Sequence, residues 1–496
     1  MRGGLFHCPD PLISCAGDGC VLYWSRTIAE RAVVSTEAKA RGKFSLRNVL
    51  SCETVPFSTM LALFLPLLLE NICTQGFGLL NTSMVSSSGM TVLSGVSLVE
   101  SVSTLFVMLF QGFASGASIL VAQYLGAHRE KEMRDVASLA VTVTAVLSAV
   151  VSLAVILLRY PLLHLCFRSA EPEVIDIAAY YLFGGTVSLP LCAVWMAELG
   201  VLRGAGESRI ALISVVANSV VYLAFNYLFL VVMDLSVLGL IWSLALSRAA
   251  GLISCMAAKR ILRSRLCRSP RELFRPVLSY LRPVIFYGFP ISFENLIMKA
   301  ARIVLLAIVT PLGTNAIASY NIAYNITVFS QIPSVAVMNT IFVAAGMCMG
   351  AGRPEELQKL YKGVAWLNRA LYLLVNGSIL LLSGPVLAAF HPEPEMLPEL
   401  HRCLWLVLGS EILYHTESFT VVYLLRGCGD VTFPAAVSVI TLCLFRLGAS
   451  WVFAHPLGLG VFGLFLGLCS DWLVRAVIFQ SRYLRGRWKT LHVISS

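Results

Sequence analysis

The sequence predicts an all-α membrane protein with twelve transmembrane helices in two six-helix lobes, related by a pseudo-two-fold axis along the membrane normal. Three observations support this fold class: an apolar composition, twelve long apolar runs and an internal repeat. Of the 496 residues, 57% are hydrophobic and only 13% are charged. Soluble domains carry about 25% charged residues, so the composition excludes an ordinary soluble globular protein.

The repeat is visible as landmarks that recur after a nearly constant interval. Glu70-Asn71 recurs in the second half as Glu294-Asn295. The motif Leu202-Arg-Gly-Ala-Gly206 recurs as Leu425-Arg-Gly-Cys-Gly429, after an interval that differs from the first by a single position. A constant interval indicates internal duplication. Because this interval is far too long for a solenoid repeat, we expect two large halves of one protein.

Each half contains six apolar runs of about 20 residues or more, which is the length needed to cross a bilayer. The short polar stretches between the runs are the expected loops. The expected spans are 56–85, 91–122, 135–159, 176–202, 209–233, 237–258, 283–311, 315–347, 360–384, 402–426, 433–455 and 459–483.

A basic linker separates the two halves. It contains eight Lys or Arg and a single acid, Glu272. The predicted domains are an N-terminal arm at 1–53, a first lobe at 54–258, the linker at 259–282, a second lobe at 283–484 and a tail at 485–496.

The loops predict the orientation in the membrane. The arm, the linker, the tail and alternate loops carry the cations, whereas loops such as 391–399 are poor in them. Cytoplasmic loops carry an excess of Lys and Arg, so we expect a multi-pass protein of the plasma membrane with both termini in the cytoplasm. Both halves then enter the membrane in the same direction, and a substrate site is expected between them near the midplane.

Charge and cysteine usage narrow the possible partners. The net charge of +10 lies in short loops between apolar runs, so we expect the lipid bilayer as a partner and no nucleic acid. The arm shows no cleavable signal pattern. The 14 cysteines form no CxxC pair and no metal-ligand spacing, and we interpret them as reduced and structural, with no metal.

The sharpest polar feature is the pair of acids Glu70 and Glu294. Each lies near the middle of its span, four residues after a proline, Pro66 or Pro290. A helix proline leaves a backbone carbonyl without its hydrogen bond, so each acid has a polar notch nearby. A carboxylate at this depth is costly and usually faces a cavity or a partner. We expect both acids, with Asn71 and Asn295, to bind a substrate or coupling ion; the alternative is that they only hold helices together.

Two cations follow on the same span as Glu294. Asn295, Lys299 and Arg302 are spaced i, i+4, i+7 and share one stripe of the helix. Because Glu294 points elsewhere, the partners of this stripe are expected on other helices, with Glu411 and Glu417 as candidates. A transport role and a purely structural ion pair both stay open.

Glu100, Glu198, Asp471 and Arg475 also lie inside apolar runs. Glu100 is a candidate site residue because serines surround it, whereas Glu198 is expected to pair with Arg203. Asp471 and Arg475 are spaced i, i+4 and are interpreted as an anchoring pair toward the cytoplasmic end of the last span.

Signatures of enzymes are missing from the sequence. The stretch 458–463 matches GxGxxG, but it follows no strand and opens a membrane span, so the sequence does not support a dinucleotide site there. Neither HExxH nor GxSxG occurs. We therefore expect no enzyme and no cofactor.

The residues from about 56 to 490 resemble the multidrug and toxic compound extrusion (MATE) transporters. The similarity is carried by Gly95-Val-Ser-Leu-Val99, Ala122-Gln-Tyr-Leu-Gly-Ala127, the two Leu-Arg-Gly motifs, and Asp471-Trp472 with Arg475, Arg482, Gly486 and Trp488. The stretch from Pro290 through Glu294-Asn295 to Arg302 is similar to a bacterial branch of that family.

The resemblance implies two lobes around a V-shaped central cavity. It implies export of small amphipathic, often cationic compounds by alternating access, driven by the inward flow of Na⁺ or H⁺. Two positions depart from the family pattern. Asn81 stands where many members carry an aspartate, and Met298 stands where some sodium-coupled members carry an acid.

We therefore expect a monomeric, ion-coupled exporter of small organic molecules. Its candidate site residues are Glu70, Asn71, Asn81, Glu100, Glu294, Asn295, Lys299, Arg302 and Glu411. A lipid or glycolipid flippase of related fold is the first alternative, and a lateral groove lined with cations would favour it. An intramembrane enzyme and a membrane receptor are alternatives of other classes.

Overall fold

The computed structural model describes residues 50–86, 90–166, 172–267, 277–491 and 493–494. Most of the predicted N-terminal arm and the middle of the basic linker lie outside these residues. From Leu50 onward, the chain forms one compact unit. The described residues form helices and connecting segments, and no strand occurs among them. The predicted domain boundaries stay predictions.

The first lobe consists of six helical segments, several of them broken or continued by a π-helix. They are α3 (Phe57–Ser86), α4 (Met90–Gly126), α5 (Glu130–Cys166), α6 (Pro172–Val187) with α7 (Leu189–Gly204), α8 (Ser208–Asn226) with η1 (Tyr227–Val232), and α9 (Ser236–Ile261).

The second lobe repeats this plan. Its segments are α11 (Leu281–Val309), α12 (Thr314–Ser330) with α13 (Ile332–Gly350), α14 (Pro354–Leu381), α16 (Leu397–Ser410) with η5 (Glu411–Thr420) and α17 (Val421–Gly427), α18 (Thr432–Thr441) with η6 (Leu442–Ala449) and α19 (Ser450–Ala454), and α20 (Gly460–Leu484). Short elements connect them: η2 (Leu278–Tyr280), η3 (Thr310–Leu312), α15 (Ser383–Ala388), η4 (Pro394–Met396) and η7 (Arg487–Thr490).

The apolar spans of the sequence correspond to these segments. Within the described residues, ten helices are long and apolar enough to cross a membrane, and α6 with α7 would make an eleventh crossing bent by 49°. The one remaining predicted span, 402–426, corresponds to the helical run from α16 through α17. Its middle carries Glu411, His415 and Glu417, so it is less apolar than the others. The prediction of two six-helix lobes is confirmed.

Several predicted spans are not the uninterrupted α-helices that we expected. The span at 176–202 breaks at Ser188, and the span at 315–347 breaks at Gln331. In both cases a proline follows within two residues, and a proline cannot donate the backbone hydrogen bond that would continue the helix. The spans at 209–233, 402–426 and 433–455 pass through the π-helical stretches η1, η5 and η6.

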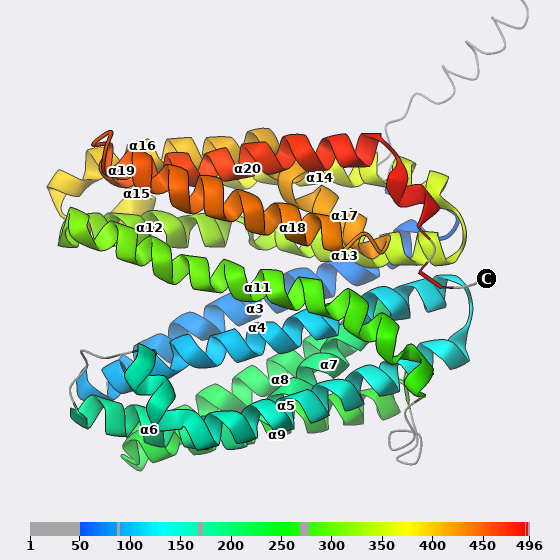
Figure 1. Cartoon of the computed structure of the whole chain (residues 1–496), viewed down its shortest axis with the longest axis horizontal. Coiled ribbons are helices and arrows are strands. Elements are labelled where there is room, and N and C mark those ends of the chain that lie inside the picture. Colours follow the sequence, from blue (N-terminus) through cyan, green and yellow to red (C-terminus); the bar gives the residue numbers. More distant parts are fainter. Residues whose placement is uncertain (1–49, 87–89, 167–171, 268–276, 492, 495–496) are drawn as a thin grey trace, which may run out of the picture. The chain divides into compact units, whose positions relative to one another are not determined.

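The two lobes contact each other along α3, α4, α11 and α13 (Figure 1). At one end, α4 and α13 approach so closely that only glycine fits. A Cβ atom on Gly126 would overlap the Met347 carbonyl oxygen, and one on Gly350 would overlap the Gln123 carbonyl oxygen. Gly350 follows Gly126, and Met347 follows Gln123, by the same interval that separates Glu70 from Glu294. The two approaches are therefore pseudo-symmetry mates.

Candidate functional site

A cavity of about 490 Å³ lies between the lobes. The first lobe contributes residues of α3, α4, α7 and α8, and the second contributes residues of α11, α13 and α17. Its polar and charged lining includes Glu70, Asn71, Asn218, Arg203, Asn295, Asn339 and Arg426. Because both repeats line it, this cavity is where the sequence predicts a substrate site.

Each lobe holds one acid–arginine pair beside this cavity. Arg203 of α7 donates a hydrogen bond to Glu70 of α3. Arg426 of α17 donates in the same way to Glu294 of α11. The two acids are separated by the interval of the repeat, and the two arginines by one position less. Duplication therefore produced the whole pair and not only the acid.

The two pairs differ in exposure. The side chains of Glu294 and Arg426 are 7% and 10% exposed, whereas those of Glu70 and Arg203 are 10% and 27% exposed. Separating a buried ion pair is unfavourable because each charge would then be buried without a counter-charge. The second-lobe pair is therefore the more tightly constrained of the two.

Hydrogen-bonding capacity is left over at both pairs. Oε2 of Glu70 and the Nε atoms of Arg203 and Arg426 are buried and have no hydrogen-bond partner among the described residues. Buried polar atoms are normally satisfied, so unsatisfied ones call for an explanation such as a ligand or an ion. Here they border a cavity that could admit one.

The neighbouring amides have different surroundings. Nδ2 of Asn71 donates to the Leu67 carbonyl one turn earlier, at 2.7 Å. Asn295 lines the central cavity and also a smaller one of about 190 Å³, which is lined by second-lobe residues and by Met108 of the first lobe and is called the second-lobe cavity below. Asn295 therefore stands between the two cavities.

The second-lobe cavity is lined with cations. Lys299, Arg302 and Arg446 all border it. The Arg302 guanidinium stacks over the Tyr324 ring with 4.5 Å to the ring centroid. Within the described residues, neither Lys299 nor Arg302 forms an ion pair with a carboxylate, whereas Arg446 pairs with Asp471 at 2.7 Å.

The expectation that Glu411 or Glu417 pairs with this cationic stripe is wrong. Glu417 pairs instead with Arg369 of α14. Glu411 accepts hydrogen bonds from neutral groups only, as described next. Helix spacing could show which residues share a face, but it could not show which helix lies opposite that face.

Glu411 is a fully buried carboxylate with neutral partners. It accepts hydrogen bonds from Ser330 at 2.7 Å, Gln331 at 2.6 Å and Asn376 at 2.8 Å, and its exposed fraction is 0%. No Lys or Arg pairs with it among the described residues. The break between α12 and α13 brings Ser330 and Gln331 to this point, so the helix interruption helps to build the site.

A buried carboxylate without a cation is unfavourable in a membrane interior. A proton or a bound metal cation removes that cost. Oδ1 of Asn376 has no hydrogen-bond partner in the described part of the chain. It is therefore an oxygen that could join the Glu411 carboxylate in binding a hard cation such as Na⁺.

Asp471 and Arg475 pair along α20 as predicted, with 2.8 Å between Nε and Oδ1. Their depth was predicted wrongly, because Asp471 lies at the middle of α20 and not toward its end. Asp471 also pairs with Arg446 of η6. The acid is thus shared between two arginines inside the second lobe.

The first lobe contains a separate cavity of about 200 Å³. Glu100, Tyr181, Tyr222 and Arg248 line it. Arg248 donates to the Gly185 carbonyl at 2.9 Å and to the Ser188 hydroxyl at 2.6 Å, and it is not paired with Glu100.

Asn81 lies in the same lobe and accepts a hydrogen bond from Asn226 at 2.7 Å. The predicted pairing of Glu198 with Arg203 is wrong. Glu198 pairs with Lys259 near the end of α9, while Arg203 is taken by Glu70.

The structure therefore brings Glu70, Asn71 and Asn295 together at the central cavity and separates Glu100, Asn81 and Glu411 from it. Sequence reasoning missed Arg203 and Arg426 as site residues. A signal was present: the Leu-Arg-Gly motif and the Glu-Asn motif recur after nearly the same interval, so both belong to what duplication preserved.

Comparisons with known proteins support this arrangement. The MatE family model matches residues 66–228 and 290–452. The second match is displaced from the first, at its start and at its end, by the interval of the internal repeat.

Two bacterial relatives cover most of the chain. The probable multidrug resistance protein YoeA of Bacillus subtilis is 25% identical over 438 residues, covering 85% of this chain and 92% of that protein. The probable multidrug resistance protein NorM of Thermotoga maritima is 24% identical over 470 residues, covering 91% of this chain and 98% of that protein.

Solved structures show the same fold. A MOP superfamily transporter from Pyrococcus furiosus, reported with reverse polarity of its binding pocket, superposes with a TM-score of 0.80 at 18% identity, over 90% of this chain and 99% of that one. An outward-facing multidrug resistance MATE family transporter superposes with a TM-score of 0.79 at 18% identity, over 91% of this chain and 99% of that one. Because the family model matches both halves and more than half of the residues, the chain belongs to the MatE family.

Proposed function

We propose that this protein is a secondary active antiporter of the plasma membrane. It exports small amphipathic organic compounds, cationic by family resemblance, in exchange for Na⁺ or H⁺ by alternating access. Family membership and the names of the multidrug resistance relatives support transport. The observation that carries the proposal is the inter-lobe cavity, which is lined by both members of the first-lobe pair, Glu70 and Arg203, and by Arg426 of the second-lobe pair.

The pairs offer a way to bind and release a cationic substrate. In the described structure, each carboxylate is held by the arginine of its own lobe. An organic cation that enters the cavity can compete with Arg203 for the Glu70 carboxylate directly, whereas of the second pair only Arg426 lines the cavity. Binding is therefore sensitive to the distance between the acid helix and the arginine helix, and a rearrangement of either lobe can release the substrate.

Glu411 is the proposed site of the coupling ion. Its partners are all neutral, so a proton or Na⁺ is the charge that would balance it. Glu411 is bound by Ser330 and Gln331, which lie at the break between α12 and α13. The helix that begins after this break, α13, contributes Val335 and Asn339 to the central cavity, so ion binding at Glu411 is connected to the cavity lining through α13.

The proposed orientation places both termini in the cytoplasm, with the lipid bilayer and the small-molecule substrate as partners of a monomer. No role for nucleic acid or for an enzymatic reaction forms part of the proposal. The basis is the distribution of Lys and Arg among the loops.

The test is transport by purified protein in proteoliposomes, with Na⁺ and H⁺ gradients imposed separately. One gradient should drive uptake of a fluorescent amphipathic cation into inside-out vesicles. Glu411→Gln keeps the size of the side chain but removes its charge, and it should abolish gradient-driven transport while substrate binding persists.

Glu355→Gln is the matched control, because Glu355 is a carboxylate in the first turn of α14 that lies away from both cavities. It should transport like the wild type. Full gradient-driven transport by Glu411→Gln would remove Glu411 from the coupling role. Failure of the wild type with every cation tested under both gradients would count against the antiporter itself.

One observation favours a second candidate function, a flippase for lipids with anionic headgroups. The second-lobe cavity carries Lys299 and Arg302 without carboxylate partners in the described residues. Such a lining suits a phosphate or carboxylate better than an organic cation. Flipping of a fluorescent anionic lipid in proteoliposomes, lost in Lys299→Met, would establish this function, whereas equal flipping by the wild type and the variant would dismiss it.

A further inference from the structure

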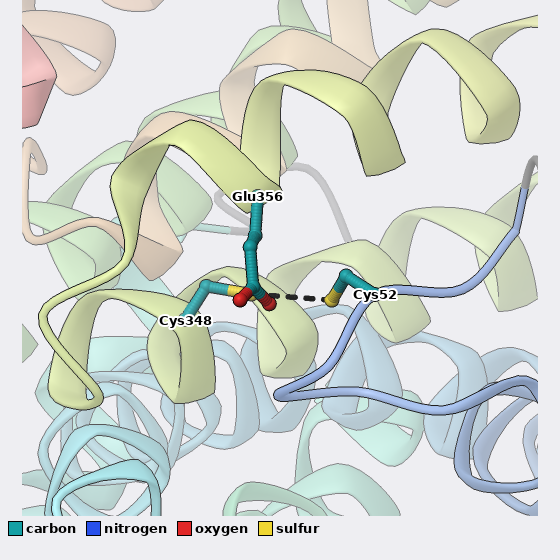
Figure 2. A group of neighbouring side chains, drawn as sticks. All are labelled: Cys52, Cys348 and Glu356. Carbon is teal, nitrogen blue, oxygen red and sulfur yellow. Dashed lines mark hydrogen bonds between the residues drawn. The ribbon is translucent and has the colours of Figure 1, made fainter.

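We propose that Cys52, Cys348 and Glu356 form a binding site for a divalent transition metal, with Zn²⁺ as the best fit. The three side chains converge at one end of the second lobe (Figure 2). This site lies apart from the central cavity and does not depend on the proposed transport function. It is the one group of His, Cys, Asp and Glu with metal-ligand geometry among the residues that the structure describes.

The distances fit zinc closely. The two Sγ atoms are 4.0 Å apart, and one ligand atom from each of the three residues lies within 4.8 Å of the others. A Zn–S bond of about 2.3 Å with tetrahedral angles places two sulfur ligands about 3.8 Å from each other. Small side-chain rotations would thus complete the coordination, with water as the fourth ligand.

Three separate segments supply the ligands. Cys348 lies in the last turn of α13 and is fully buried, and Glu356 lies in the first turn of α14. Cys52 comes from the non-helical segment that precedes α3, 296 residues away from Cys348. No local spacing in the sequence could have revealed such a site, which is why the cysteines look merely structural there.

The backbone already holds the first segment in place. The Thr54 amide donates to Glu356 Oε2 at 3.0 Å, and the Val55 amide donates to Cys52 Sγ at 3.3 Å. An amide donor stabilises a thiolate, which is the form that binds metal.

Charge balance also favours a divalent ion. Two thiolates and one carboxylate around Zn²⁺ leave a single negative charge. The Arg353 guanidinium lies beside this charge, with Nη1 2.9 Å from Glu356 Oε1, and it also pairs with Glu53 at 2.5 Å. Thiolate ligands select zinc over the hard cations Mg²⁺ and Ca²⁺, which prefer oxygen.

The site would fasten the segment before α3 to the second lobe. Glu53 and Thr54, the neighbours of Cys52, line a cavity of about 960 Å³ that is also bordered by Gly350 and Arg353 of the second lobe and by His128 of the first. The metal would therefore fix one wall of a space that both lobes share at this end.

The test uses the full-length purified protein, reduced and passed over a desalting column after incubation with Zn²⁺. Wild type and Cys267→Ser should retain about one zinc per chain. Cys52→Ser and Cys348→Ser should lose it, and Glu356→Gln should bind it more weakly. Cys267 is the matched control because it is an exposed cysteine outside the cluster. Replacement of zinc by Co²⁺ should give thiolate-to-cobalt absorption in the wild type and not in Cys52→Ser.

Several results would overturn the proposal. Wild-type protein without bound zinc, or equal zinc in Cys52→Ser, would exclude the site. A disulfide between Cys52 and Cys348, detected by intact mass after alkylation, would mean that the two cysteines form a covalent bond and do not bind a metal. If Cys348→Ser fails to fold, Cys52→Ser still decides, because Cys52 lies outside the helices.

Discussion

Breaking the ion pair of the second lobe should cost more than breaking its twin in the first lobe. Glu294→Gln leaves Arg426, only 10% exposed, without a counter-charge. Removal of one partner from a buried pair typically destabilises by about 3–5 kcal/mol, whereas removal of both leaves no orphan charge. The double variant Glu294→Gln/Arg426→Gln should therefore be more stable than the sum of the single effects predicts, by about 1–3 kcal/mol.

The same cycle on Glu70 and Arg203 should give a smaller coupling. Arg203 is 27% exposed, so solvent screens its charge and the coupling should be about 1 kcal/mol. Unfolding of the purified protein in mixed micelles gives the free energies for both cycles, and proteoliposome transport gives the functional effect of each variant.

Arg260→Gln is the control for loss of an exposed cation, and it should change stability by less than about 0.5 kcal/mol. Additive effects at Glu294 and Arg426 would refute the reasoning, because they would mean that the two charges do not depend on each other. A first-lobe coupling equal to or larger than that of the second lobe would refute the argument from burial.

Three further predictions concern topology, coupling and lobe packing. In a cysteine-free background, Arg268→Cys should be labelled only from the cytoplasm and Glu395→Cys only from outside; the reverse pattern would invert the orientation. Asn81→Asp adds a titratable group and should alter the pH profile of transport, so an unchanged profile at normal expression would exclude this position from coupling. In Gly350→Ala, the new Cβ would overlap the Gln123 carbonyl oxygen and should destabilise the protein by about 1–3 kcal/mol. Gly377→Ala is the control, because open space surrounds Gly377. Equal unfolding midpoints for the two variants would contradict the close approach of α4 and α13.

The fold could be predicted because the features that determine it, the apolar runs and the repeated motifs, can be recognised directly in the sequence. Apolar length gives the spans, and the constant interval between landmarks gives the two lobes. The breaks at Ser188 and Gln331 were missed because a proline inside an apolar run can either kink a helix or end it, and only packing decides.

The candidate site was predicted less completely. The sequence identified Glu70 and Glu294 as deep acids but assigned them no arginine. Arg203 lies 133 residues after its acid, and no single-helix spacing links the two. For Glu198 the nearest cation in the sequence was the wrong one, because Lys259 of another helix lies closer in space.

Comparison of the halves separates what both lobes share from what only one has. The acid–arginine pairs and the glycine approaches occur in both lobes. The Asn81 amide occurs in the first lobe only, because the corresponding position of the second repeat is the apolar Leu305. In the proposed alternating-access cycle, a feature present in both lobes suits a step that both would perform alike, which is to open and close around the substrate. A carboxylate with only neutral partners is found at Glu411, on the second-lobe side of the cavity. If Glu411 binds the coupling ion as proposed, one ion site in one lobe would be enough to drive the proposed cycle, because residues of both lobes line the cavity and a movement of α13 would change that lining.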